Sequence, residues 1–263
     1  MDPDIKFSVF TKPWPDLSLP ELGKLVSSLG FDGIELPVRP GFQVEPENVQ
    51  ALPEAAAVLA EFGVTICSIA GPTDEAAIAA CAAADVPTIR VMARIGQGES
   101  YVAAEARLKK EYDALVPCLE KYGVQVGVQN HFGRFIMHGV GLRELVKSYD
   151  PKTIAVVWDA AHEALNGGLP DLALDAVWPH LCMVNLKNAI WQRVNGPEAV
   201  IGRYEIYWTS GRQGLANWPV VVAELKKRQY SGVVCLTAEY SDHQAVGRLI
   251  AEDIVFARTL FEG

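Results

Sequence analysis

Short apolar segments alternate with longer amphipathic segments along most of the chain. The apolar segments are rich in Val and Ile and predict eight buried strands, at residues 5–11, 33–38, 64–70, 88–93, 124–130, 154–159, 181–187 and 232–239. Between them, apolar residues recur at helical spacing, as in residues 101–122, and Ser18 with Glu21 forms a capping pattern at the start of a helix. This alternation predicts repeated strand–helix units and a parallel sheet.

Eight such units that close on themselves form a (β/α)8 barrel, which we expect to be a single domain over residues 1–263. A doubly wound open sheet is disfavoured because no glycine-rich phosphate-binding motif follows the first strand, and we expect no nucleotide cofactor. The connection over residues 188–218 is too long for a plain loop and carries Trp191, Trp208 and Trp218. Such a connection is typical of a lid or of a contact surface in a homo-oligomer.

Charge and composition narrow the class of partner. The chain has 263 residues, 50% of them hydrophobic, and a formal net charge of -9. An acidic chain does not favour binding to nucleic acid or to an anionic membrane. We see neither a secretory signal at the N-terminus nor an apolar run of transmembrane length, and the five scattered Cys are typical of reduced thiols. These features predict a cytoplasmic protein with a small-molecule ligand.

Polar residues stand at or just beyond the ends of five predicted strands. In a barrel these ends share one mouth, where alternate residues point inward, so Gln129 shares a side with His131, and Asn185 with Lys187. Each residue alone is as well explained as a buried polar group satisfied by a neighbour, and Asp159 also fits a helix cap with His162 on the surface. Together they predict a small-molecule pocket. They are Glu35, Gln129, Asn130, His131, Asp159, His162, Asn185, Lys187, Asn188 and Glu239.

Five short motifs in this order resemble the xylose-isomerase-like barrels, also called sugar phosphate isomerases/epimerases. The motifs are Gly33-Ile-Glu-Leu36, Gln129-Asn-His131, Trp158-Asp-x-x-His162, Val184-Asn-Leu-Lys187 and Ala238-Glu239. The resemblance implies a sugar-like substrate and one divalent metal held by Glu, Asp, His and Glu from the last four strands. It also implies that the two Glu transfer the substrate's proton in the epimerases.

Two of the four implied metal ligands depart from the family pattern. Asp159 and Glu239 match, whereas Gln129 stands in place of Glu and Asn185 in place of His. Amide oxygens suit Mn²⁺ or Mg²⁺, but the changes remove a charge and an imidazole, so the resemblance implies an atypical or weakened metal site.

Gln129 cannot act as a base, so a second base must come from His131, His162 or Lys187, or Glu239 must move the proton along one face alone. Without a metal, Lys187 is the preferred electrophile for the enediolate oxygen. Its alternative role is an ion pair with Asp159 or Glu239.

Further candidates for substrate binding are Trp14, which with Phe10 forms an apolar wall or simply packs, and Arg134, which faces a substrate carboxylate or phosphate. Arg212 in the long connection is a third candidate, placed over the mouth, and a surface salt bridge is the alternative for either Arg. The leading hypothesis is a sugar isomerase or epimerase that abstracts a proton beside a carbonyl. The alternatives are a lyase or dehydratase on a keto-sugar or inosose, and a sugar-binding barrel without turnover. A DNA-repair endonuclease is disfavoured because its three-zinc cluster is rich in His, and this chain has only five.

Overall fold

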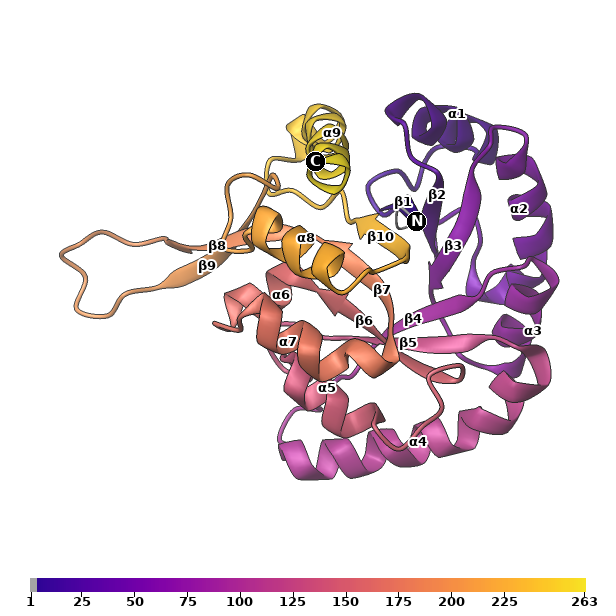
Figure 1. Ribbon diagram of the computed structural model, residues 1–263, viewed down its shortest axis with the longest axis horizontal. Helices are drawn as coiled ribbons and strands as arrows, with labels where there is room; N and C mark the ends of the chain where they lie inside the picture. The colour runs from indigo at the N-terminus through magenta and orange to yellow at the C-terminus, as the bar shows by residue number, and fades with distance from the viewer. Residues whose placement is uncertain (1–3) are drawn as a thin grey trace.

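A closed barrel of parallel strands forms the centre of the computed structural model, which describes residues 4–263 (Figure 1). Around the barrel the strands follow the order β1-β10-β7-β6-β5-β4-β3-β2, so that β1 pairs with the last strand of the chain. The barrel strands are β1 (Ile5–Phe10), β2 (Gly33–Pro37), β3 (Thr65–Ala70), β4 (Thr88–Met92), β5 (Gln125–Gln129), β6 (Ile154–Asp159), β7 (Leu181–Leu186) and β10 (Gly232–Leu236). This topology confirms the predicted (β/α)8 barrel. The predictions about the N-terminus and about a domain starting at residue 1 extend to residues 1–3, which lie outside the described residues.

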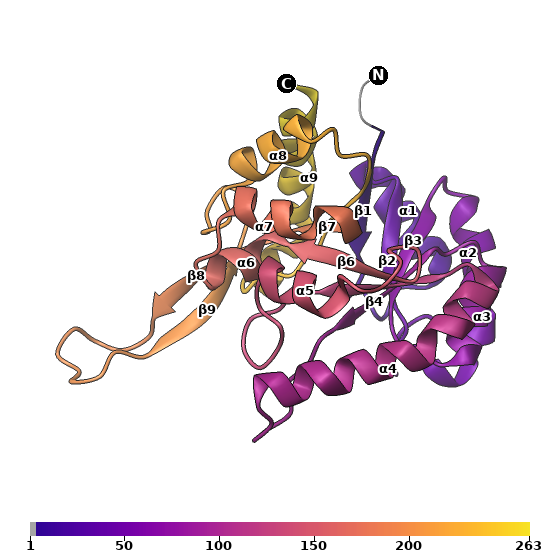
Figure 2. The same ribbon diagram turned by 60° about the horizontal axis from the view of Figure 1, so that its bottom comes forward.

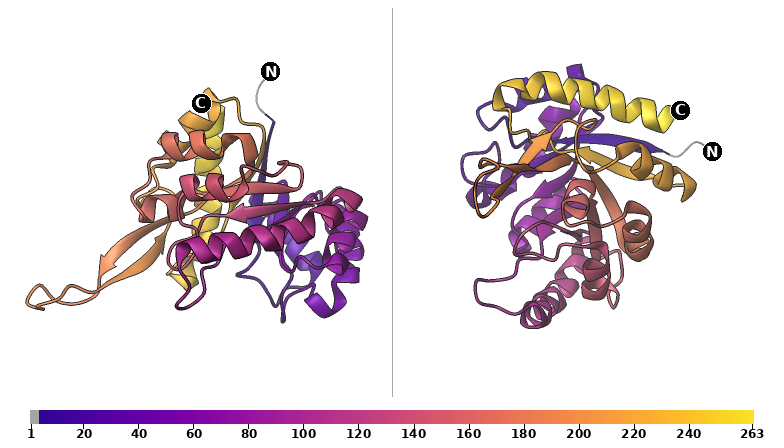
Figure 3. Two further views of the ribbon diagram at one scale, coloured as in Figure 1. Left: turned by 90° about the horizontal axis from the view of Figure 1, so that it is seen from below. Right: turned by 90° about the vertical axis from the view of Figure 1, so that its left-hand side faces the viewer.

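Helices cover the outside of the barrel, with α4 along one side and α9 beside β1 (Figures 2 and 3). Phe7 of β1 packs edge-on against Phe261 of α9, with ring centroids 5.6 Å apart. The α-helices are α1 (Leu19–Leu29), α2 (Leu52–Ala60), α3 (Glu75–Ala83), α4 (Tyr101–Tyr122), α5 (Gly139–Val146), α6 (Ala160–Leu165), α7 (Pro170–Val177), α8 (Trp218–Lys227) and α9 (Val246–Glu262). Short 3₁₀ helices are η1 (Pro46–Ala51), η2 (Trp178–His180) and η3 (His243–Ala245).

The apolar pattern explains how the elements pack. Every residue of β2 and β6 is buried, as expected for strands covered on both faces. At the start of α1 the predicted capping box is present, with the backbone N–H of Ser18 donating to the Glu21 carboxylate at 2.9 Å. Gly23 brings α1 close to the turn after α2, because a Cβ at this position would lie 2.6 Å from Cδ2 of Phe62.

The long connection after β7 contains a structure that the sequence pattern did not predict. Strands β8 (Asn188–Arg193) and β9 (Tyr204–Thr209) form an antiparallel hairpin that projects from the barrel (Figure 1). The three Trp of this connection have different environments: Trp191 is 44% exposed, Trp218 is buried against Phe256, and Trp208 faces the barrel mouth.

Other differences concern element ends. The strand predicted over residues 232–239 ends at Leu236, and the strand predicted over residues 5–11 ends at Phe10. None of the helices within residues 4–263 combines the length and apolar content that a membrane span requires.

Candidate active site

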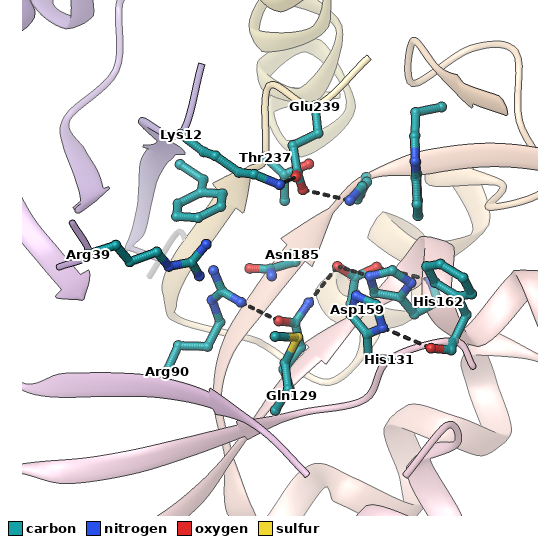
Figure 4. Close-up of a pocket in the computed structure, with 15 residues that line it drawn as sticks. Lys12, Arg39, Arg90, Gln129, His131, Asp159, His162, Asn185, Thr237 and Glu239 are labelled. Atoms are coloured by element: carbon teal, nitrogen blue, oxygen red, sulfur yellow. Dashed lines mark hydrogen bonds and ion pairs between the residues drawn. The ribbon is translucent and has the colours of Figure 1, made fainter. Parts of the chain in front are cut away.

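A pocket of about 280 Å³ opens where the carboxyl ends of the barrel strands meet (Figure 4). Because the strands run parallel, this single mouth gathers side chains from almost the full length of the chain. Its lining includes four Lys or Arg side chains and two carboxylates, although the whole chain carries a net charge of -9. The lining residues are Phe10, Lys12, Arg39, Arg90, Met92, Gln129, His131, Phe132, Asp159, His162, Asn185, Lys187, Trp208, Thr237 and Glu239.

Glu239 holds two lysines at the edge of the pocket. It follows Ala238, whose φ of 51° is a left-handed conformation that is unfavourable for a residue with a Cβ. The Glu239 carboxylate accepts hydrogen bonds from Lys187 Nζ, at 2.6 Å, and from Lys12. Burial disfavours the charge of Glu239, but the two ammonium groups outweigh burial and lower the pKa to about 2. Glu239 is therefore an ionised carboxylate bound to cations, and a weak base.

Lys187 reaches the pocket from the end of β7 and is only 7% exposed. Its Nζ lies 3.7 Å from the centroid of the Trp208 ring, which the hairpin supplies, so a cation–π contact stabilises the ammonium. An ammonium has three N–H donors, and within residues 4–263 Lys187 uses only the one that it gives to Glu239. Lys187 is thus a fixed cation with donors available to a ligand.

A chain of hydrogen bonds crosses the pocket from Arg90 to Asp159. Arg90 Nη1 donates to Gln129 Oε1 at 2.5 Å, and Gln129 Nε2 donates to Asp159 Oδ2 at 2.9 Å. Beneath the pocket, Arg90 Nε donates to Oε1 of the fully buried Glu35 at 2.6 Å. These bonds direct the amide oxygen of Gln129 toward a guanidinium and its NH₂ group toward a carboxylate.

Asp159 has two roles, since it caps a helix and also lines the pocket. Its Oδ1 accepts the backbone N–H of His162 at 3.0 Å and thereby caps α6, as one interpretation of the sequence predicts. His162 itself is 1% exposed and lines the pocket. Complete burial raises the pKa of Asp159 to about 6, although the charge of Lys187 opposes this shift.

His131 and His162 form a pair of imidazoles, with ring centroids 4.0 Å apart. Nδ1 of His131 lies 2.9 Å from the carbonyl oxygen of Phe132, which can only accept, so this nitrogen carries the proton and Nε2 is left unprotonated. Burial lowers the pKa of both imidazoles, and the nearby charge of Lys187 lowers that of His162 further. Both rings are therefore neutral at pH 7, which makes His131 a candidate base.

Asn185 is fully buried at the centre of the pocket (Figure 4). Neither its Oδ1 nor its Nδ2 has a hydrogen-bond partner within residues 4–263. Unpaired buried polar groups destabilise a fold by about 1–3 kcal/mol each. A ligand hydroxyl or carbonyl placed beside Asn185 would relieve this penalty, so Asn185 makes the pocket a candidate binding site.

The residues at the four family ligand positions do not fit a divalent metal. Cationic side chains hold two of their oxygen donors, since Arg90 binds the oxygen of Gln129 and two lysines bind Glu239. Within residues 4–263, no three His, Cys, Asp or Glu side chains converge in the arrangement of a metal site. The positive charge at this mouth is supplied by the ammonium and guanidinium groups of the chain.

The structure brings together seven of the predicted site residues: Gln129, His131, Asp159, His162, Asn185, Lys187 and Glu239. Glu35 lies beneath the pocket on Arg90, and Trp14 packs beside the hydrophobic core. Arg134 donates to two backbone carbonyls in the loop after β4, and the guanidinium of Arg212 lies 3.7 Å from the Phe256 ring. Trp14, Arg134 and Arg212 are not among the residues that line this pocket, and their predicted substrate contacts stay predictions.

Sequence reasoning did not assign several of the lining residues to the site, among them Lys12, Arg39, Arg90 and Trp208. Arg90 had a recognisable signal, because a charge inside an otherwise apolar strand must point toward a polar interior. Lys12 follows the first strand directly and belongs to the same class of strand-end residue. Arg39 and Trp208 come from connections whose path the hydrophobic pattern does not define.

Parallel strands that close into a barrel define a (β/α)8 fold, and the polar pocket at their carboxyl ends is its candidate binding site. Residues 24–260 match the family described as xylose isomerase-like TIM barrel, and the chain belongs to this family. The resemblance inferred from the sequence motifs is confirmed. No curated protein sequence matches the chain.

Solved structures share this architecture. The probable 3-DHS dehydratase AsbF from Bacillus anthracis is 16% identical, with a TM-score of 0.74 over 96% of this chain and 98% of that chain. The 3-keto-D-glucoside 4-epimerase YcjR from E. coli is 15% identical, with a TM-score of 0.74 over 97% of this chain and 100% of that chain. The IOLI protein, solved with a zinc atom, is 14% identical, with a TM-score of 0.71 over 97% of this chain and 96% of that chain. At these identities the likeness shows the fold alone.

Proposed function

We propose that the chain is an isomerase of a small sugar-derived carbonyl compound, with His131 as the base and Lys187 as the electrophile. The observation that carries this proposal is the presence of a neutral imidazole and a fixed ammonium in one pocket. Proton transfer beside a carbonyl needs a base for the carbon and a positive group for the oxygen. The names of the epimerase and dehydratase that share the fold also support carbonyl chemistry.

In the proposed step, Nε2 of His131 takes the proton from the carbon beside the carbonyl. The electron pair of the C–H bond forms a C=C bond, and the electrons of the carbonyl move to its oxygen. Lys187 donates a hydrogen bond to that oxyanion. The imidazolium then returns the proton to the former carbonyl carbon while the hydroxyl proton moves between the two oxygens, which gives the isomeric carbonyl compound.

The distribution of charged groups favours a single base over two opposed bases. His131 and His162 lie on one side of the pocket, whereas Arg39 and Arg90 lie on the other (Figure 4). Epimerisation with one base on each face requires a second proton acceptor, and a guanidinium does not serve as one. In this proposal Glu239 is a positioning residue, because its carboxylate holds Lys187 at 2.6 Å.

The proposal is tested by proton exchange in D₂O. The full chain is incubated with a panel of small aldoses, ketoses and their carboxylate and phosphate derivatives, and NMR follows deuterium entry beside the carbonyl. We expect exchange with isomer formation for at least one compound, and a loss of about a hundredfold to ten-thousandfold in His131→Gln. His180→Gln is the matched control, because His180 contacts the backbone of Tyr149.

Exchange that survives in His131→Gln would overturn the assignment of the base. Loss of water in place of isomer formation would assign the chain to the lyases. Binding of panel compounds without any exchange would favour the sugar-binding barrel without turnover.

A further inference from the structure

The basic side chains of the pocket are not equally neutralised. Lys12 and Lys187 share the carboxylate of Glu239, and Arg90 is paired with Glu35. Arg39, in the loop after β2, forms no side-chain hydrogen bond or salt bridge within residues 4–263, although it lines the pocket and is half-buried. The pocket therefore presents a cation that has no direct ion-pair partner among the described residues.

Arg39 and Arg90 are held side by side above one aromatic ring. Their guanidinium carbons lie 5.8 Å and 4.8 Å from the centroid of the Phe10 ring. Burial lowers the pKa of Arg39, and the neighbouring charge of Arg90 lowers it further. Two like charges in a half-buried site repel each other, and an anion between them removes this repulsion.

Arg90 is also fixed in orientation. Its Nε donates to Glu35 and its Nη1 to Gln129, so within the described residues Nη2 keeps its donors free. Guanidinium groups bind carboxylate and phosphate through paired, parallel N–H donors. A second cavity of about 390 Å³ also has Arg39, Arg90 and Met92 in its lining, which leaves room beside the arginines for a bulky group.

We infer that Arg39 and Arg90 bind a carboxylate or phosphate group of the substrate, on the side of the pocket opposite the imidazoles. The inference deepens the proposed function, on which the assignment of the ligand as a substrate rests: the carbonyl end faces Lys187 and His131, and the anionic end faces the arginines. A neutral sugar would leave Arg39 without an ion-pair partner. The substrate class is therefore a sugar acid or a sugar phosphate.

Calorimetric titration with unreactive probes tests binding independently of turnover. The probes are erythronate, erythritol 4-phosphate and the neutral polyol erythritol, each titrated into the full chain at low and high salt. We expect at least one anionic probe to bind at least tenfold more tightly than erythritol, with an affinity that falls as salt rises. The tighter of the two anions distinguishes a carboxylate ligand from a phosphate ligand.

Three variants assign the effect to Arg39. Arg39→Met should weaken binding of the tighter anion by about tenfold to a hundredfold and leave erythritol binding unchanged, since only the anion accepts charge-assisted hydrogen bonds from the guanidinium. Arg39→Lys should give an intermediate loss, because it keeps the charge without the fork. Arg143→Met, an equal change of charge on the exposed surface of α5, should bind like the unmodified chain.

Equal binding of anions and erythritol would overturn the inference, as would anion binding that is unchanged in Arg39→Met. Anion binding through Arg39 without deuterium exchange in any compound would uphold the anion site and refute the proposed isomerase. Exchange of neutral sugars that does not depend on Arg39 would uphold the proposed isomerase and refute the anion site.

Discussion

The ammonium of Lys187 lies 2.6 Å from Oε2 of Glu239, and the two residues come from the ends of neighbouring barrel strands, β7 and β10. Glu239 stands at a position where the family pattern places a metal ligand. Here its charge is directed to Lys187 and Lys12. The site thus keeps a positive group where the proposed function places the substrate carbonyl, but that group is covalently part of the chain.

Lys187→Met should lower deuterium exchange by about a hundredfold to a thousandfold, the usual loss when one donor to a developing oxyanion is removed. The apolar side chain keeps the contact with Trp208, but Glu239 loses one of its two cations, so we expect a lower unfolding temperature and measure exchange where the variant is folded. Lys147→Met, at the residue directly after α5, is the control, because Lys147 pairs with Glu144 on the surface. Normal exchange in Lys187→Met would refute its role as the electrophile.

Metal analysis should find less than one metal ion per chain, after purification without chelator and after incubation with Mn²⁺ or Mg²⁺. The physical reason is that Lys12, Lys187 and Arg90 already bind the oxygens that a cation would need. Asp159→Ala is the comparison, because a real site would lose its metal in this variant. Stoichiometric metal that disappears in Asp159→Ala would restore the weakened metal site implied by the sequence resemblance.

The exchange rate should rise with pH through an inflection below 6.5, the ordinary pKa of His, because burial lowers the pKa of His131. Imidazolium cannot take a proton, so activity is lost in acid and reaches a plateau once the ring is neutral. Measuring exchange from about pH 4 to about pH 8 checks the direction of the shift. An inflection above 6.5 would contradict a buried neutral imidazole.

The barrel was predictable from sequence because its signal is repeated. Eight strands such as Ile154–Asp159 are buried on both faces, so each appears as an apolar run between helical periods. The hairpin was not predictable by this criterion. Its strands lie outside the barrel and are largely exposed, as in Asn188–Arg193, so no apolar face identifies them.

Strand-end residues were predictable for a similar reason. Alternation along a strand places Gln129 with His131, and all parallel strands deliver their ends to one mouth. Contacts that depend on side-chain direction could not be predicted. From the sequence, both Arg134 and Arg39 lie in loops after strands. In the structure, Arg134 donates to backbone carbonyls, whereas Arg39 lines the pocket.

Asp253 on α9 gives a prediction about stability. Its buried carboxylate accepts the backbone N–H of Gly211 at 2.9 Å and the hydroxyl of Tyr240 at 2.8 Å, and burial raises its pKa from 3.8 to about 6. The folded chain therefore binds a proton that the unfolded chain lacks between these pH values. Protonation of Asp253 therefore increases the free energy of unfolding by about 3 kcal/mol as pH falls through this window, because each pKa unit corresponds to about 1.36 kcal/mol.

Asp253→Asn cannot take up this proton and should lose that gain. Urea unfolding at about pH 4.5 and about pH 7 measures the difference, because the remaining carboxyl groups titrate in both proteins. The free energy of unfolding of the unmodified chain, relative to that of Asp253→Asn, should be larger at about pH 4.5 than at about pH 7. A difference that does not change with pH would contradict the raised pKa.

Truncation of the hairpin tip, residues 194–203, tests whether the hairpin is a lid or an oligomer interface. Its apolar side chains are exposed, with Val200 at 101% and Ile201 at 76%, and it projects from the barrel, whereas Trp208 at its base lines the pocket (Figure 1). Because Arg193 pairs with Tyr204, an Asn-Gly turn can replace residues 194–203 without changing the register. We expect the truncated chain to keep its exchange activity. We also expect it to form an oligomer of fewer subunits than the full chain does, as measured by light scattering, since exposed apolar groups favour association. The same number of subunits with lost exchange would show that the tip acts as a lid over the pocket. The same number of subunits with unchanged exchange would exclude both roles.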